Sequence, residues 1–341
     1  YVCINEGYDK AAERLKEAAE KAKAAVPGID TEIEFLKLKS ELGEETVLIR
    51  DIEGKTRMPS LRPPYPSTSG INGKPTLVNS AETLVCAAAV MRAGADAFKS
   101  VGEPDSPGTK LFGVCGAVSG PGLYEVPMGT TLKELLEAAG VNAEKPLKAI
   151  LVGGTAGAFV SPEQTDMHLD YEGIAQKGGV IGSSVIYVAN ESDCIVDLSY
   201  NCLTVSNSRS CGKCVLCREG TYQLKEMLKD ITEGKAKPED LDLMVEIGES
   251  MRAGAFCGMG RSAANPVLTA LSLLKDEFEA HIRRKKCDAM VCKKYVSFFI
   301  LPEKCQGCEK CLDVCPEDAI DGEEDMIHVI DQTGCTRCGK C

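Results

Sequence analysis

The alternation of apolar and polar positions predicts a strand and a helix at the start of the chain. The stretch YVCI, residues 1–4, is short and apolar enough for a strand. Small or apolar residues then recur at helical spacing, at Ala12, Leu15, Ala19 and Ala22. Asp9 can cap this helix, which should end before Pro27. Because alanines permit close packing of a helix on a sheet, we expect residues 1–56 to form part of an α/β layer.

The pattern changes further along. A second helix is predicted in NSAETLVCAAAVMRAG, whose Asn79 and Glu82 have the spacing of a capping box. After the linker at 106–109, short strands and turns surround one helix that Thr131 and Glu134 open. This mixture predicts a small α+β unit.

Amphipathic helices dominate the next part of the chain. They are expected at about 218–230, 238–252 and 260–283. Gly254 and Cys257 lie between the last two. The basic run HIRRKK then leads into a tail that is dense in cysteine.

Composition and charge narrow the class of protein. The 341 residues suggest two to four domains, and 44% hydrophobic residues suffice for ordinary cores. The net charge of −12 argues against nonspecific binding to nucleic acid or anionic membranes. No apolar run reaches the roughly 18 residues of a membrane helix. We therefore expect neither nucleic-acid binding nor membrane insertion.

The cysteines give the strongest chemical signal. Nine of the 18 lie in the last 55 residues, mostly in C-x-x-C runs, which is the spacing of metal ligands rather than of disulfides. Thiol ligands imply a reducing compartment, so we expect the protein in the cytoplasm. The chain begins at Tyr1 and stops at Cys341 within a motif, and we expect further residues at both ends.

A first candidate metal site combines one compact motif with a distant cysteine. SCGKCVLCREG places Cys211, Cys214 and Cys217 three residues apart, and Cys257 follows 40 residues later at a predicted turn between helices. A helical hairpin would return Cys257 to the loop. Four thiolates around one point suit either tetrahedral zinc or a [4Fe–4S] cluster, and spacing alone leaves both open.

The tail carries a more specific pattern. CQGCEKCLDVCP is the bacterial ferredoxin run C-x2-C-x2-C-x3-C-P, formed by Cys305, Cys308, Cys311 and Cys315. A second run starts with Cys335, Cys338 and Cys341. In two-cluster ferredoxins the fourth cysteine of each run binds the other cluster, so Cys315 should join the second run. The first run then needs a further cysteine, expected after residue 341.

Five motifs together resemble a known family, the NADH-oxidising flavoprotein subunit of complex I and its relatives in soluble hydrogenases and formate dehydrogenases. They are GEET (43–46), LRPPYP (61–66), GKPTLVNSAET (73–83), SCGKCVLCREGT (210–221) and FCGMGRSAANP (256–266). The resemblance extends to about residue 286. The ferredoxin tail is most similar to the β subunit of NAD-linked, electron-bifurcating [FeFe]-hydrogenases.

The resemblance implies a multidomain α/β and α+β fold. Its parts would be a partial Rossmann-like flavin domain (1–105), a β-grasp-like SLBB domain (106–197), a helical bundle with a [4Fe–4S] site (198–286), and a linker with a ferredoxin-like domain (287–341). It implies three [4Fe–4S] clusters, FMN and NAD(H) as cofactors. The partners would be other subunits of a hydrogenase-like or formate-dehydrogenase-like complex, including a [2Fe–2S] thioredoxin-like subunit, and ferredoxin.

The resemblance also implies a nucleotide site in the first domain. The FMN pocket would be lined by Gly43, Glu44, Val78, Asn79 and Thr83. The nicotinamide nucleotide would contact Glu45 and Tyr65. The sequence departs from the family where Ser80 replaces a usual Asn, Leu42 a usual Cys and Leu216 a usual Pro.

The remaining cysteines and histidines carry weaker signals. Cys287 and Cys292, spaced C-x4-C, form either a zinc pair with ligands beyond Cys341 or two packed thiols. Scattered cysteines are expected to be buried small side chains, namely Cys3, Cys86, Cys115, Cys194 and Cys202. The three histidines, His168, His281 and His328, are predicted to lie at the surface.

These features predict an electron-input subunit that moves electrons between NAD(P)H, FMN and [4Fe–4S] clusters. One alternative is an iron–sulfur relay subunit without flavin. Others are the equivalent subunit of an NAD-dependent formate dehydrogenase and a zinc-stabilised scaffold.

Overall fold

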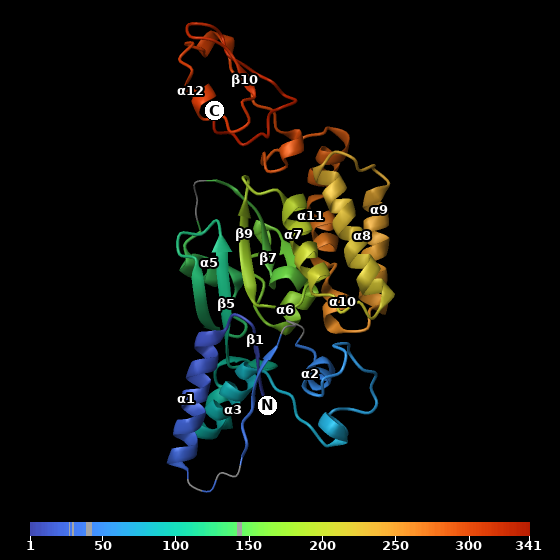
Figure 1. The fold of residues 1–341 in the computed structure, drawn as a ribbon. Helices are drawn as coiled ribbons and strands as arrows, with labels where there is room; N and C mark the ends of the chain where they lie inside the picture. Colours follow the sequence, from blue (N-terminus) through green and yellow to red (C-terminus); the bar gives the residue numbers. More distant parts are fainter. Residues whose placement is uncertain (27, 29–30, 39–42, 142–144) are drawn as a thin grey trace.

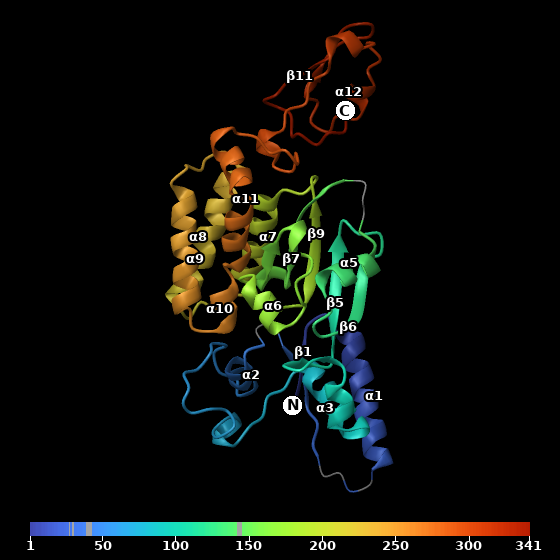
Figure 2. The same cartoon turned by 180° about the vertical axis from the view of Figure 1, so that it is seen from behind.

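The computed structural model describes residues 1–26, 28, 31–38, 43–141 and 145–341. The chain forms an elongated molecule (Figure 1). Its first hundred or so residues lie at one end, a sheet and a helical bundle lie side by side in the middle, and the cysteine-rich tail lies at the other end, as both views show (Figure 2). Leu42 falls outside the described residues.

The first segment contains a parallel strand pair joined by a helix. Its elements are β1 (Val2–Asn5), α1 (Asp9–Ala25), β2 (Phe35–Leu38), α2 (Glu45–Ile52), the 3-10 helix η1 (Ile71–Gly73), α3 (Ala81–Ala93) and α4 (Ala95–Lys99). Strands β1 and β2 pair in parallel. Parallel neighbours need a crossover connection, and α1 lies between them in the chain. The predicted first strand and first helix are confirmed.

Two predicted helix caps are wrong by one residue. Tyr8 occupies the N-cap of α1, and Asp9 lies in the first turn and pairs with Lys37 at 2.7 Å. At α3 the cap is Ser80, whose hydroxyl accepts a hydrogen bond from the Thr83 amide, rather than Asn79. Serine and asparagine cap about equally well, so spacing alone did not separate them.

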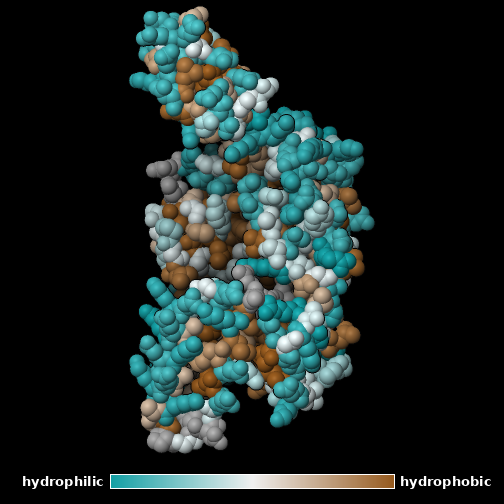
Figure 3. All heavy atoms as spheres, in the orientation of Figure 1, coloured by the Kyte–Doolittle hydropathy of each residue, from teal (hydrophilic) through white to brown (hydrophobic). Residues whose placement is uncertain are grey.

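None of the 13 residues of helix α3 is buried. Its apolar side chains Leu84, Val85 and Met91 are 58%, 69% and 88% exposed. Figure 3 shows hydrophobic residues on the surface of this first segment, whereas hydrophilic residues cover much of the bundle and tail. Within the described residues, no helix combines the length and apolar composition needed to cross a bilayer.

The middle of the chain forms a mixed sheet. Its elements are β3 (Gly102–Glu103), β4 (Ser106–Pro107), β5 (Thr109–Gly116), β6 (Gly122–Pro127), α5 (Leu132–Ala139), β7 (Leu147–Val152), η2 (Gly154–Ala156), β8 (Ala158–Val160), η3 (Pro162–Gln164), α6 (Tyr171–Gln176) and β9 (Val185–Asn190). Five strands pair in the order β6-β5-β9-β7-β8, with β5 parallel to β9. The predicted capping box of Thr131 and Glu134 opens α5.

The bundle and the tail complete the chain. The bundle helices are α7 (Ile195–Ser208), α8 (Val215–Thr232), α9 (Asp240–Gly254), α10 (Gly258–Ser262) and α11 (Asn265–Arg283). The tail contains η4 (Lys293–Tyr295), η5 (Pro302–Lys304), α12 (Lys310–Asp313), β10 (Ile320–Asp321) and β11 (Val329–Ile330), of which the last two pair antiparallel. The amphipathic helices predicted for this region are confirmed, and α7 is an addition.

The sheet is covered on both faces. In β7, Ile150 and Val152 pack into a core with α5, while Ala149 and Leu151 pack into the core of the bundle. Successive strand residues point to opposite faces, so a sheet buried on both sides requires a continuous apolar run. The run AILV in β7 meets this requirement. The sheet is therefore one wall of the bundle core.

Candidate metal and nucleotide sites

The first cysteine motif lies where two bundle helices meet. Cys211 and Cys214 belong to the loop between α7 and α8, Cys214 is the N-cap residue of α8, and Cys217 is buried in its first turn. Gly212 has φ of +75°, a left-handed conformation that glycine adopts without steric cost. The loop can therefore turn tightly between its two thiols.

Cys257 lies at the same end of the bundle as the first cysteine motif, although it comes later in the sequence, between α9 and α10. It is the N-cap residue of the short helix α10, which follows α9 directly. A Cβ atom on Gly260 of α10 would lie only 3.4 Å from the Cys217 Sγ atom, so α10 packs directly against this thiol. The hairpin of α8 and α9 thus returns the fourth cysteine to the first three.

The electrostatics agree with this placement. Burial raises the pKa of the Cys217 thiol, a hydrogen bond with Ser210 opposes the shift, and the neighbouring Cys214, Cys257 and Cys211 raise the pKa further. Each of these three thiols is thus near enough to Cys217 to affect its ionisation. A bound cation would remove the repulsion between the thiolates, because metal binding takes up deprotonated thiols.

In the tail, Cys315 lies with the second cysteine run. One hollow is lined by Cys315, Cys335, Cys338 and Cys341. Burial, and then the proximity of Cys335, Cys338 and Cys311, raises the pKa of Cys341. The structure thus places Cys315 beside the three cysteines with which an interleaved ferredoxin arrangement would combine it.

In the first tail run, hydrogen-bond donors surround the sulfur of Cys305. Backbone amides of His328 and Gly307, followed by the His328 ring, lower the pKa of Cys305 to about 7. His328 is buried, with Nδ1 3.8 Å from the Cys305 sulfur, so the prediction of a surface histidine is wrong here. Amide hydrogen bonds to sulfur are one of the means by which proteins tune cluster potentials.

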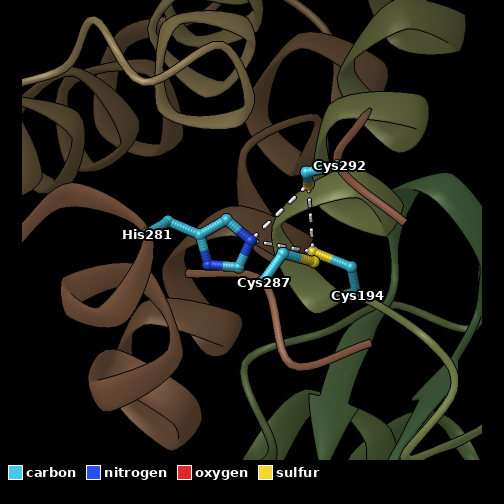
Figure 4. A group of neighbouring side chains, drawn as sticks. All are labelled: Cys194, His281, Cys287 and Cys292. Carbon is cyan, nitrogen blue, oxygen red and sulfur yellow. Dashed lines mark hydrogen bonds between the residues drawn. The ribbon is translucent and has the colours of Figure 1, made fainter. Parts of the chain in front are cut away.

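A further group of donors links the sheet, the bundle and the start of the tail. It consists of Cys194, His281, Cys287 and Cys292, all buried, with ligand atoms within 4.8 Å of one another (Figure 4). The Cys194 sulfur lies 3.7 Å from the Cys292 sulfur and 3.4 Å from His281 Nε2. The prediction that His281 lies at the surface is wrong, and two partners for the Cys287–Cys292 pair come from before the tail rather than from beyond Cys341.

The side chain of His281 is oriented by the backbone. Its Nδ1 lies 2.8 Å from the carbonyl oxygen of Glu277, and Nε2 points toward the sulfurs (Figure 4). An Nδ1–H donor to a carbonyl leaves Nε2 free to act as a ligand. Hydrogen bonds from Cys194 and Cys292 lower the pKa of Cys287. Hydrogen bonds with Cys287 and Cys292, and then burial, raise the pKa of Cys194.

The residues expected at the nucleotide lie on two separate stretches. Glu44 caps α2 by accepting from the Val47 amide, and Arg62 pairs with both Glu44 and Glu45. Tyr65 is 57% exposed. Gly43 is exposed, and so are Asn79 and Thr83 at the start of α3, with Val78 half-buried. That these stretches share one nucleotide pocket stays a prediction.

Comparison with protein families divides the chain in the same way as its cysteine motifs. Residues 197–281 match the NADH-ubiquinone oxidoreductase-F iron-sulfur binding region. Residues 111–153 match the SLBB domain, and residues 298–321 match a 4Fe-4S binding domain. The chain therefore contains two kinds of iron–sulfur binding region with an SLBB domain before them.

Whole-chain comparison decides the family. The chain is 38% identical over 339 residues to the NADP-reducing hydrogenase subunit HndC of Solidesulfovibrio fructosivorans, covering 96% of this chain and 69% of that protein. The chain belongs to this family of hydrogenase subunits. It is also 37% identical over 246 residues to the F subunit of NADH-quinone oxidoreductase from Streptomyces coelicolor, covering 72% of this chain and 55% of that protein.

Members of the HndC family and their NADH-quinone oxidoreductase relatives are oxidoreductase subunits, and the solved structures agree. An NAD+-reducing [NiFe]-hydrogenase in the H2-reduced state matches with a TM-score of 0.76 and 32% identity, over 82% of this chain and 48% of that one. The chain spans 69% of the HndC protein and about half of the other two relatives. The family and the multidomain fold expected from the motifs are confirmed.

Sequence reasoning missed two members of the four-donor group in this HndC relative. Cys194 was expected only to be a buried side chain, and it is indeed buried. It lies 87 residues from His281 and 98 from Cys292, and no local motif joins them. The only sequence signal was the position of His281 six residues before Cys287.

Proposed function

We propose that this chain is the electron-input part of a cytoplasmic, multi-subunit oxidoreductase, moving electrons between NAD(P)H and iron–sulfur clusters in a hydrogenase-like complex. The proposal rests on the meeting of Cys211, Cys214, Cys217 and Cys257 at one end of the bundle. Figure 1 shows α10 at the end of the bundle that faces α2. The cysteine site is thus on the side of the bundle nearest the proposed nucleotide residues.

The four bundle cysteines fit a [4Fe–4S] cluster. They supply only thiolates, three of them lie in the first turn or at the N-cap of α8 and α10, and one of them is already buried. Helix N-termini carry partial positive charge, which favours an anionic cluster. Thiolate ligation by four cysteines is the usual arrangement for such cubes.

The protein's contribution is to hold and separate the redox groups. When bound, FMN supplies the exchange of a two-electron hydride for single electrons, and the clusters carry single electrons. Gly43, Glu44, Val78, Asn79 and Thr83 would hold FMN. Glu45 would bind the nicotinamide nucleotide, and the ring of Tyr65 would stack on its base.

The tail would hold two further clusters. Cys315, Cys335, Cys338 and Cys341 supply a complete thiolate set, and Cys305, Cys308 and Cys311 supply three ligands of another. Amides of Ala319 and Arg337 point at the Cys315 and Cys335 sulfurs at 3.4 Å each. The tail would pass electrons to ferredoxin or another subunit, such as a [2Fe–2S] thioredoxin-like one.

We further propose that the group of Cys194, His281, Cys287 and Cys292 holds zinc. In a tetrahedral site with metal–sulfur bonds of about 2.3 Å, the sulfurs are about 3.8 Å apart. The separation of 3.7 Å between Cys194 and Cys292 is close to this value. Three cysteines and one histidine are a common structural zinc set.

The electron-input proposal is tested by replacing the fourth bundle cysteine. In the anaerobically purified full-length protein, Cys257→Ser should lower the iron content by about four atoms, one cube. Reduction of bound flavin by NADH should persist, while electron transfer onward to the tail clusters should fall to background. Cys86→Ser, a half-buried cysteine outside every donor group described above, is the matched control.

Iron analysis, low-temperature EPR and stopped-flow absorbance measure these effects. Equal iron content and equal onward transfer in Cys257→Ser and Cys86→Ser would contradict the proposal. An iron-loaded wild-type protein that neither binds flavin nor oxidises NADH would favour a flavin-less relay subunit instead.

A further inference from the structure

Lys213 connects the bundle cysteine loop to two other parts of the molecule. It lies between Cys211 and Cys214 in the sequence. Its ammonium nitrogen is 4.6 Å from the centre of the Phe256 ring, and Phe256 directly precedes Cys257. The same nitrogen donates a hydrogen bond to the carbonyl oxygen of Pro59, 154 residues away. One side chain therefore touches both ligand-bearing loops and the first segment of the chain.

The acceptor of this hydrogen bond belongs to an ordered hydrogen-bond network. Pro59 is buried, and the next amide, that of Ser60, donates to the Thr46 hydroxyl at 2.8 Å. Thr46 is buried as well and donates to the Glu44 carboxylate. Lys213 thus holds the stretch that is bonded to the N-terminal turn of α2, where Glu44 and Glu45 of the proposed nucleotide residues lie.

Lys213 and Arg261 are both basic residues near the cysteines whose described partners are neutral groups. Arg218 is paired with Glu219 at 2.8 Å and donates to the Gly212 carbonyl. Arg261 donates to the Ala255 carbonyl. Among the described residues Lys213 has only the Phe256 ring and a neutral carbonyl as partners. Its positive charge is therefore not cancelled by a nearby carboxylate.

We infer that Lys213 is a positioning residue that seats the cysteine loop on residues 57–62 and raises the reduction potential of the bundle cluster. A cluster gains negative charge on reduction, and a fixed positive charge nearby stabilises that state. The second effect rests on the proposed function of the four cysteines. The first does not, because seating involves only groups of the protein itself.

The experiment compares Lys213→Met, Lys213→Gln and Lys213→Arg in the full-length, iron-loaded protein. Methionine removes charge and hydrogen bond, glutamine removes the charge and keeps a donor, and arginine keeps both. Lys225→Met is the matched control, because Lys225 also lies over an aromatic ring, that of Tyr222 at 5.1 Å, but two turns along α8 from Cys217. The EPR signal that Cys257→Ser abolishes identifies the bundle cluster.

The reduction potential of the bundle cluster and the contact of the cysteine loop with residues 57–62 are measured separately. At a fixed potential, Lys213→Met and Lys213→Gln should raise the oxidised-to-reduced ratio of the bundle cluster by about three- to tenfold, a tenfold change being 59 mV for one electron. Lys213→Arg and Lys225→Met should change it less than about twofold. Hydrogen exchange of residues 57–62 should become about fivefold faster in Lys213→Met, as expected for one lost hydrogen bond, and stay near wild type in Lys213→Arg.

Several outcomes would overturn the inference. If the hydrogen-exchange rate of residues 57–62 is the same in Lys213→Met and Lys225→Met, Lys213 does not hold the cysteine loop on these residues, whether or not iron is bound. If Lys213→Gln has full iron content and an unchanged oxidised-to-reduced ratio of the bundle cluster, the charge of Lys213 does not raise the reduction potential of that cluster. If Lys213→Met binds no cluster, the comparison of iron content replaces that of potential. Lys213→Gln should then lose iron and Lys213→Arg should retain it. Equal iron content in Lys213→Gln and Lys213→Arg rejects the role of the charge. A wild-type protein without a bundle cluster refutes the proposed function and leaves the exchange result standing.

Discussion

At the scale of single residues, the role of a side chain depends on neighbours that are remote in sequence. His281 has no cysteine within five residues, yet three buried sulfurs face its ring. In the structure these thiols and the imidazole contact one another, at 3.4 Å for Cys194–His281 and 3.5 Å for Cys292–His281, so the ligand atoms already converge on one point. A bound ion would satisfy all four donors at once.

The zinc proposal predicts a selective loss of metal. In the full-length protein, Cys292→Ser should lose about one zinc per chain and keep its iron content, because the cluster cysteines lie elsewhere. Mass spectrometry of both metals makes the comparison. The protein should also melt at a lower temperature, since metal binding energy contributes to folding.

A suitable control is Cys202→Ser, which changes another buried cysteine. Burial raises the pKa of Cys202 to about 12, so this thiol stays protonated and is not poised to bind metal. Equal zinc in the two variants, or iron in place of zinc in the wild type, would reject a zinc site here.

At the scale of elements, one turn illustrates how backbone geometry restricts sequence. Gly116 ends β5 with φ of +92°, and a Cβ atom there would lie 2.2 Å from the carbonyl oxygen of Val188 in β9. No rotamer can relieve a contact between Cβ and backbone. The end of the parallel β5–β9 pair therefore requires glycine at this position.

Gly116→Ala should destabilise the sheet by about 1–3 kcal/mol, from backbone strain and the collision with β9. Urea denaturation followed by circular dichroism measures the change. Gly122→Ala, in the paired strand β6, has nothing within 4 Å of its added Cβ and should cost much less. Similar losses in the two variants would show that the close contact is not what matters.

The sequence predicts most of the elements but not all. The capping box at Thr131 was identified because both of its residues have diagnostic types and spacing. Helix α7, IVDLSYNCLTVSNS, was missed, since it is rich in β-branched and polar residues that favour helix only weakly. Its burial against α8 and the sheet provides the stability that local preference does not. Tertiary contacts also decide the four-donor group, which no periodic pattern reveals.

At the scale of the whole molecule, the sheet and the bundle share one apolar core. Phe159 of β8 and Leu151 of β7 pack with Leu203, Leu224 and other bundle residues. The Phe159 amide also donates to the Thr269 hydroxyl of α11 at 3.0 Å. Two regions that match separate families thus depend on each other for burial.

This shared core predicts joint unfolding. Leu151→Ala should destabilise the sheet and the bundle together by about 2–5 kcal/mol, because it leaves a cavity between them. Hydrogen exchange measured by mass spectrometry should show the same acceleration in peptides of β9 and of α8. Leu123→Ala, at a site 77% exposed, is the control and should change neither. Acceleration confined to β9 would mean that the two regions open independently.

The two cysteine runs of the tail have matching backbone geometry with different residues. Gly307 and Glu309 have φ of +63° and +56°, and the corresponding Arg337 and Gly339 have +57° and +73°. Each run thus has one glycine and one non-glycine residue in the left-handed region, and the position that is glycine in one run is the non-glycine residue in the other. The two loops therefore share a backbone conformation that does not depend on which of the two positions carries the glycine. The two loops should therefore be interchangeable, so a chain in which residues 305–311 replace residues 335–341 should keep the left-handed conformation at both positions of the second run.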